Sequence, residues 1–128
     1  MTKYYSYFFT RQDMSPEQQI VQTAHAAMCM GVWSQRVVNN STASENTTPI
    51  VPYQVQNEVV PENTYFTVIG VRNEPALESV MRILDHFGYR YEAFCEPDMG
   101  GTITSVALYP ISEYHRDVLL AFDLLKVR

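Results

Sequence analysis

The chain has 128 residues, of which 46% are hydrophobic and 18% charged, a composition that suits one folded domain and excludes wholesale disorder. Nine Lys and Arg against fourteen Asp and Glu give a net charge of −5, which excludes a large basic nucleic-acid surface but leaves a local patch open. No apolar run approaches the ~20 residues that span a bilayer, and the first residues lack the pattern of a secretory signal. We therefore expect a cytoplasmic protein with no membrane association.

The first predicted elements are a strand and a helix. The aromatic run at Tyr4–Thr10 is typical of a buried strand. Ser15 can cap a helix that has Pro16 in its first position, and Gln18 can complete a capping box. Apolar and small residues then recur at three- and four-residue spacing, so we expect this helix to run to about Gly31.

The middle of the chain divides into an irregular stretch and a second strand–helix pair. Residues 39–63 are polar at first, have no period and contain three prolines, which predicts a flexible insertion loop. Residues 65–71 form a near-continuous apolar run, as expected of a central strand. Asn73 then caps a second helix that Gly88 ends.

The last elements define the fold class. Two more strands, Tyr89–Cys95 and Thr102–Tyr109, are separated by a short turn, and Ser112 caps a final helix. Helices that alternate with strands imply parallel pairing through right-handed crossovers, and the short turn implies one antiparallel pair. The prediction is a single α/β domain over residues 1–128, with a mixed four-stranded sheet and the order β-α-(loop)-β-α-β-β-α.

The turn before the fourth strand carries candidate chemistry. Asp98, Thr102 and Thr104 lie in or just after this turn, and loops at strand ends build the sites of α/β proteins. A carboxylate and two hydroxyls can position and activate a water molecule. An acidic turn that contains glycine is also ordinary in a hairpin, so a purely structural role stays open.

A second candidate is a polar face of the first helix. His25 shares this face with Gln18, Gln22 and Cys29, which predicts a side chain that looks into a cleft; a surface histidine bonded to nearby backbone is the alternative. Both Cys29 and Cys95 are expected to be reduced thiols. The chain has no zinc signature, P-loop or GxSxG motif, so we expect neither a metal nor a cofactor.

Two separated stretches carry the most distinctive motifs. The first is FFTRQDM at residues 8–14, which leads to QTAHAA at residues 22–27; the second is DMGGT at residues 98–102, followed by TSVALYP at residues 104–110. Together they resemble the type 2 peptidyl-tRNA hydrolases: the opening strand and Arg-x-Asp-Leu turn, the Gln-x-Ala-His-Ala-Ala helix and the Asp-Ala-Gly-x-Thr turn of that family. The resemblance covers about residues 4–31 and 65–125.

The resemblance implies a fold, a reaction and a site. The fold is a three-layer α/β/α domain, and the reaction is hydrolysis of the ester that joins a peptide to the 3′ end of tRNA, which makes tRNA the partner. Asp98 would orient or activate the attacking water, and Thr102 or Thr104 would bind or polarise the ester. The implied substrate-binding residues are Arg11, Gln18, Gln22, His25 and Gly100.

The chain departs from the family just before the first helix. The Gly-Lys-Gly-Lys of the family is replaced by SPEQ at residues 15–18, a shorter opening that resembles a bacterial and phage branch. The charge that would stabilise a developing oxyanion is thereby lost, which typically costs about 10²–10³ in rate; Arg11 and Arg36 are the candidate replacements. Three interpretations stay open: a hydrolase of this or a related ester, a binding module for tRNA ends, a small ligand or a protein, and a regulatory ligand-binding domain. Tyr- and Phe-rich strand edges also leave a homodimer open.

Overall fold

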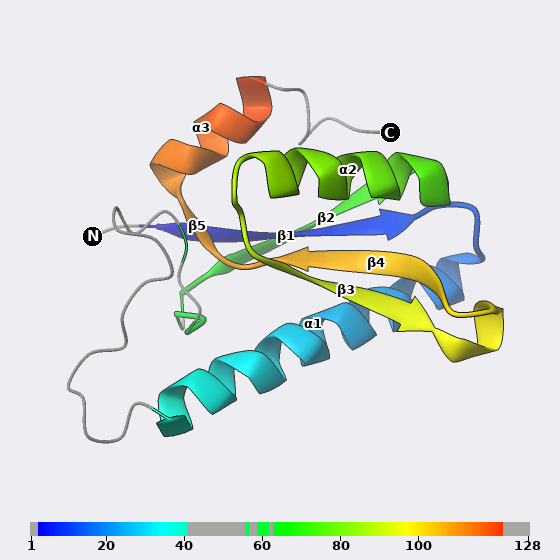
Figure 1. The fold of residues 1–128 in the computed structure, drawn as a ribbon, viewed down its shortest axis with the longest axis horizontal. Helices are drawn as coiled ribbons and strands as arrows, with labels where there is room; N and C mark the ends of the chain where they lie inside the picture. Colours follow the sequence, from blue (N-terminus) through cyan, green and yellow to red (C-terminus); the bar gives the residue numbers. More distant parts are fainter. Residues whose placement is uncertain (1–2, 41–55, 57–58, 62, 122–128) are drawn as a thin grey trace.

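The computed structural model describes residues 3–40, 56, 59–61 and 63–121 of the chain. Most of the predicted insertion loop at 39–63 lies outside these residues. The described elements, drawn in Figure 1, are β1 (Tyr4–Arg11), α1 (Pro16–Asn40), β2 (Tyr65–Val71), α2 (Glu74–His86), β3 (Tyr91–Glu96), the short 3₁₀ helix η1 (Pro97–Met99), β4 (Thr102–Leu108), β5 (Ile111–Ser112) and α3 (Glu113–Ala121).

The strands form one mixed sheet in the order β2-β1-β4-β3, and the short β5 pairs with the start of β1. β1 and β2 are parallel, whereas β1 and β4, like β3 and β4, are antiparallel. α1 covers one face of the sheet, and α2 and α3 lie on the other (Figure 1). The predicted α/β class, with helices on a mixed sheet, is therefore confirmed.

β1 is buried on both faces because it lies inside the sheet between two helical layers. Its side chains alternate between those layers, as a strand requires: Tyr7 and Phe9 pack with α2, and Phe8 packs with Ala26 of α1. The aromatic run that predicted this strand thus supplies core to both sides at once.

The edge position of β2 corrects one prediction. The apolar run at residues 65–71 predicts a central strand, but β2 lies at the edge of the sheet, with Phe66 and Val68 exposed. An apolar run reports only that its side chains favour burial, and it carries no information on which strands flank it. The central strands are β1 and β4.

Other elements also differ from the predictions: β3 covers Tyr91–Glu96 rather than Tyr89–Cys95, and β4 ends at Leu108 rather than Tyr109. The sheet gains a fifth strand, β5, which has only two residues and pairs with β1; so short a strand has no pattern of its own. α1 continues nine residues beyond Gly31 to Asn40. Glycine stops a helix only when the chain turns there, and Gly31 faces open space on the exposed side of α1 while Met30 and Ser34 stay buried against the sheet.

The predicted caps of the first two helices are confirmed. The Ser15 hydroxyl accepts a hydrogen bond from the Gln18 N–H at 3.2 Å, and the Asn73 side chain accepts one from the Ala76 N–H at 3.1 Å. Such caps satisfy backbone donors that a helix leaves unpaired at its first turn. Within the described residues, no helix is both long and apolar enough to cross a membrane.

Candidate functional site

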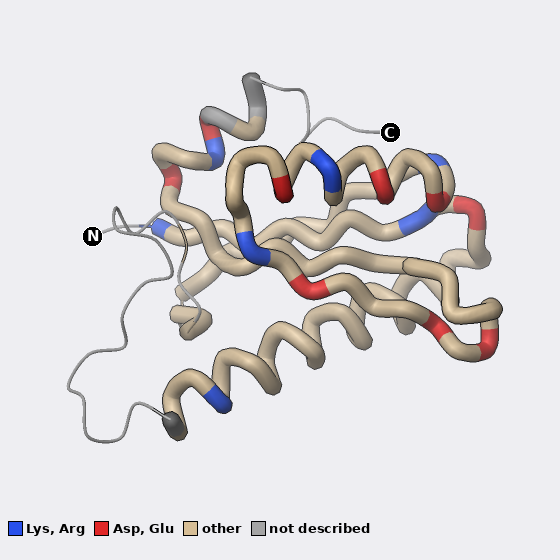
Figure 2. Tube along the Cα trace, in the orientation of Figure 1, with Lys and Arg blue, Asp and Glu red and all other residues tan. Residues whose placement is uncertain are grey.

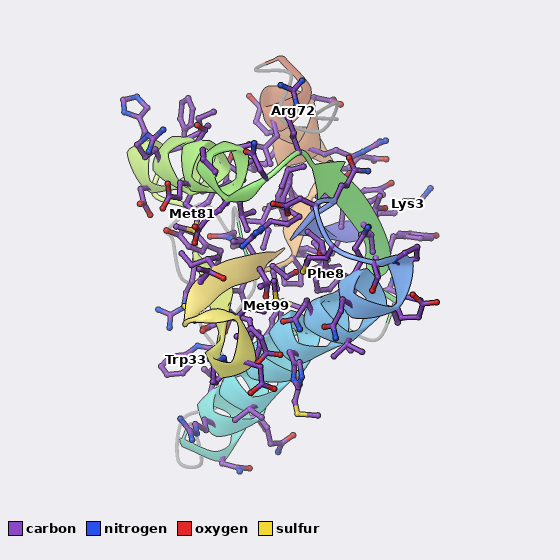
Figure 3. All side chains as sticks on the ribbon, turned by 90° about the vertical axis from the view of Figure 1, so that its right-hand side faces the viewer. Lys3, Phe8, Trp33, Arg72, Met81 and Met99 are labelled. Carbon is purple, nitrogen blue, oxygen red and sulfur yellow. The ribbon has the colours of Figure 1, made fainter. Side chains whose placement is uncertain are left out.

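Segments that are far apart in the sequence meet at one end of the sheet and form a small cleft. The β1–α1 connection contributes one wall and the β3–β4 turn the other. Figure 3 looks onto this end of the molecule, where the turn that carries Met99 lies beside α1. The cleft has a volume of about 360 Å³ and is lined by Asp13, Met14, Ser15, Gln18, Glu96, Asp98 and Met99.

A buried amide network lies beneath this cleft. The side chain of Gln22 is fully buried; its Oε1 accepts a hydrogen bond from the Thr104 hydroxyl at 2.7 Å, and its Nε2 donates to Glu96 at 2.9 Å and to Gln18 at 3.1 Å. Both amide donors and the amide acceptor are therefore satisfied. The network fixes α1 against β3 and β4, and it explains why glutamine rather than an apolar residue occupies this helix position.

Arg11 lies beside the cleft, but its charge is already paired. Its guanidinium donates two hydrogen bonds to the carboxylate of Asp13, at 2.9 and 3.0 Å, and also reaches the hydroxyl of Thr102 at 3.3 Å. The hydrogen bond from Arg11 is the main reason why the pKa of Asp13 is lowered. Arg11 thus ties the β1–α1 connection to the start of β4, and most of its charge is neutralised.

Asp98 presents its carboxylate to the cleft from η1. It is exposed, and within the described part of the chain no group donates a hydrogen bond to its side chain, so that the carboxylate is open to water or a ligand. Gly100 and Gly101 follow with φ values of 72° and 74°. These left-handed conformations favour glycine, and they turn the chain directly from Asp98 into β4.

The two threonines are committed to internal hydrogen bonds. Thr104 is fully buried and donates to Gln22, whereas the hydroxyl of Thr102 donates to the Met99 carbonyl at 2.9 Å and contacts Arg11. Neither residue lines the cleft. Both are therefore placed to hold the turn and the network rather than to contact a ligand in the cleft.

His25 lies in a separate pocket further along α1. Its ring stacks on Phe94 of β3 with centroids 4.5 Å apart and an interplanar angle of 10°. This second pocket, of 380 Å³, also contains Cys29, whose thiol pKa is raised by burial, which makes it a poor nucleophile. The pocket is lined by His25, Met28, Cys29, Val32, Trp33, Arg36, Glu92 and Phe94.

The structure therefore divides the predicted site residues into groups. Gln18 and Asp98 line the cleft; Gln22 and Thr104 lie beneath it; Arg11, Thr102 and Gly100 support its walls. Sequence reasoning did not select Glu96 or Asp13, although both line the cleft. Two features of the sequence could have indicated them. The alternation of β3 ends on Glu96, and the Arg-x-Asp spacing lets Arg11 reach Asp13.

The cleft is acidic. Asp13, Glu96 and Asp98 are three carboxylates on its walls, and Figure 2 shows acidic residues gathered at this end of the molecule. No group of three or more His, Cys, Asp or Glu residues within the described ranges is arranged to hold a metal ion.

No protein-family model matches the chain, and none of the curated proteins compared with it matches either. The resemblance to the type 2 peptidyl-tRNA hydrolases therefore rests on the motif residues alone.

Proposed function

We propose that the protein is a peptidyl-tRNA hydrolase-like enzyme that cleaves the ester between a peptide and the 3′ end of tRNA. One observation supports the proposal: the two stretches that resemble the family, more than 70 residues apart, meet beside one cleft through the Gln22–Thr104 hydrogen bond. The convergence leaves one open carboxylate, that of Asp98, and one exposed amide, that of Gln18, on opposite walls.

In the proposed mechanism, Asp98 is the general base. Its carboxylate accepts a proton from a water molecule, and the water oxygen attacks the ester carbonyl. The resulting tetrahedral intermediate collapses as the tRNA 3′ oxygen leaves and takes the proton held by Asp98, so that the products are deacylated tRNA and a peptide carboxylic acid, which loses its proton to solvent. A positioned carboxylate of this kind typically contributes about 10²–10⁴ in rate.

Gln18 is assigned the role of oxyanion donor. Its Oε1 accepts the hydrogen bond from Gln22, and within the described residues its Nε2 has no acceptor, which leaves that N–H for the developing negative charge. A neutral amide stabilises an oxyanion less than a lysine does, because hydrogen bonds to ionised donors are roughly twice as strong. We therefore expect slower turnover than a lysine-bearing site would give. Gln22 is a positioning residue that orients Gln18.

The decisive experiment measures release of deacylated tRNA from an N-acetyl-aminoacyl-tRNA by the wild-type chain and by Asp98→Asn. We expect the substitution to lower kcat about 100-fold or more, since it removes the base and keeps the shape. Glu78→Gln, at an exposed position of α2, is the matched control and should retain full activity. Turnover that is equal in wild type and Asp98→Asn would contradict the mechanism.

A second candidate function is a binding module, and the acidity of the cleft favours it. Asp13, Glu96 and Asp98 repel the phosphates of tRNA, whose binding depends on neutralising cations, and the one arginine beside them is paired with Asp13. A cleft of this charge suits an amine or a guanidinium group on a small ligand or protein. Absence of turnover at high enzyme concentration, with a folded chain, would support this candidate over the hydrolase.

A further inference from the structure

Within the described part of the chain, the edge strand β2 lacks the features that usually protect a sheet edge. Among the described strands it pairs only with β1, so none of them pairs with the N–H and C=O groups on its outer side. The seven residues YFTVIGV include no charge, and Tyr65, Phe66 and Val68 are 52%, 60% and 58% exposed. Proteins normally blunt an edge of this length with charges, proline or a bulge, since an exposed apolar edge pairs with another chain.

The opposite edge of the same sheet is protected. β3 carries Glu92 and Glu96, and its register shifts between Phe94 and Cys95. Charges and irregular register both discourage strand addition. The contrast between the two edges indicates that a binding partner covers the outer side of β2.

An apolar groove continues from β2 onto α1. Phe66 and Val68 form one wall, Phe8 lies at its base, and Ile20, 71% exposed, stands on the other wall. The volume is 590 Å³, and none of the residues that line it is charged; they are Phe8, Pro16, Gln19, Ile20, Thr23, Ala24, Ala27, Phe66 and Val68. The surface that needs a partner therefore includes a helix as well as a strand.

We propose that a second copy of this chain covers β2, through antiparallel β2–β2 pairing about a two-fold axis at Thr67. In this register Phe66 of each copy lies opposite Val68 of the other, Tyr65 lies opposite residue 69, and Thr67 lies opposite itself. Aromatic residues opposite β-branched residues and threonine opposite threonine are the cross-strand pairs that stabilise antiparallel strands. The strand is thus complementary to itself, as a two-fold interface requires.

The exposed side chains supply a large part of the area that such a dimer needs. Taking roughly 200 Å² for one whole large side chain, the exposed parts of Tyr65, Phe66, Val68 and Ile20 amount to on the order of 500 Å². This is more than half of the ~800 Å² that each partner buries in a stable interface. The uncharged surface also avoids bringing the negative charges of two chains with net charge −5 into direct contact.

The proposed dimer leaves the acidic cleft open. β2 and β3 are at opposite edges of the sheet, and the cleft lies at the end of β3 (Figure 1). The proposed interface can therefore be tested independently of the proposed hydrolase activity.

Sedimentation of the purified full chain tests the proposal. We expect the wild type to sediment with twice the mass of the chain at tens of micromolar. Val68→Lys should raise the dissociation constant at least about 100-fold, because each copy would bury an unpaired charge. Val32→Lys makes the same change at an exposed position of α1 outside the groove and should leave the dimer intact. A monomeric wild type, or equal effects of the two substitutions, would overturn the proposal and leave β2 to a different protein.

Disulfide cross-linking tests the register without a charge in the strand. In a chain with Cys29 and Cys95 replaced by Ser, Thr67→Cys should form an intermolecular disulfide within the dimer, because directly opposed residues have Cα atoms about 4.5–5.5 Å apart. Ser79→Cys, exposed on α2, is the control and should not cross-link. Equal cross-linking of both variants would overturn the proposed register.

Discussion

Arg11 lies beside the cleft, and its partners determine its role. An unpaired lysine in this region would offer a free charge to a ligand, whereas Arg11 donates two hydrogen bonds to Asp13 and one to the Ile103 carbonyl. The planar guanidinium matches a carboxylate in this two-bond geometry. Arg11 therefore contributes to the shape of the cleft more than to its charge.

The Arg11–Asp13 pair predicts a pH effect. The pKa of Asp13 is lowered in the folded chain, chiefly by the hydrogen bond from Arg11. The Arg11–Asp13 pair therefore stabilises the folded chain at pH values above the unfolded-state pKa of Asp13, which is roughly 3.9. This stabilisation is lost as the pH falls through the lower folded-state pKa. Arg11→Met should raise the pKa of Asp13 toward its ordinary value. The free energy of unfolding of this variant should then depend less on pH over the same acid range.

An NMR titration of the Asp13 carboxyl carbon measures this effect. Arg82→Met removes a guanidinium that is exposed on α2 and bonds to Ser79, so it should leave the Asp13 titration unchanged. An Asp13 pKa that is the same with and without Arg11 would show that the pair has no thermodynamic role.

At the scale of elements, Gln22 links α1 to the β3–β4 pair by hydrogen bonds. Its hydrogen bonds to Glu96 and Thr104 cross from the helix to two strands, in a region where an unpaired polar group is costly. The helix face that carries it was predicted from spacing, but the spacing does not reveal that Gln22 is buried while Gln18 on the same face is exposed.

Gln22→Leu should destabilise the chain by about 2–3 kcal/mol, because it leaves the Thr104 hydroxyl and the Glu96 carboxylate without their amide partner. Urea unfolding followed by circular dichroism measures the change. Gln35→Leu, at an exposed position of the same helix, should change stability by no more than about 0.5 kcal/mol. A similarly small change for Gln22→Leu would mean that the network adds little to stability.

At the scale of the whole molecule, the sheet is anchored by its two central strands. β1 lies between β2 and β4, and β4 lies between β1 and β3. Both strands lie between the helical layers, and their residues Phe9, Val106 and Leu108 are fully buried. Backbone hydrogen bonds that lie deepest in the core open only with global unfolding.

Amide hydrogen exchange should therefore be slowest in β1 and β4, and faster in β2 of the monomeric Val68→Lys chain, where one side of the strand has no neighbour among the described strands. Exchange followed by NMR measures the rates residue by residue. Amides of β2 or β3 that exchange more slowly than those of β1 and β4 would contradict the strand order.

Local patterns alone determined most of the elements of this protein, though neither the two-residue β5 nor the end of α1. The Tyr4–Thr10 strand, the Ser15 and Asn73 caps, the order of helices and strands and the α/β class follow from neighbours within a few residues, because hydrogen-bond capping and hydrophobic period act over that range. The candidate residues Gln18 and Asp98 were likewise visible as motifs.

Tertiary structure decided where those elements lie and which side chains are free. The edge position of β2, the pairing of Arg11 across to Thr102, the burial of Gln22 against Thr104 and the separate pocket of His25 all involve partners tens of residues away in the chain. Two residues 82 positions apart, as Gln22 and Thr104 are, leave no shared local pattern. Their contact exists only because the sheet brings both to one end of the molecule.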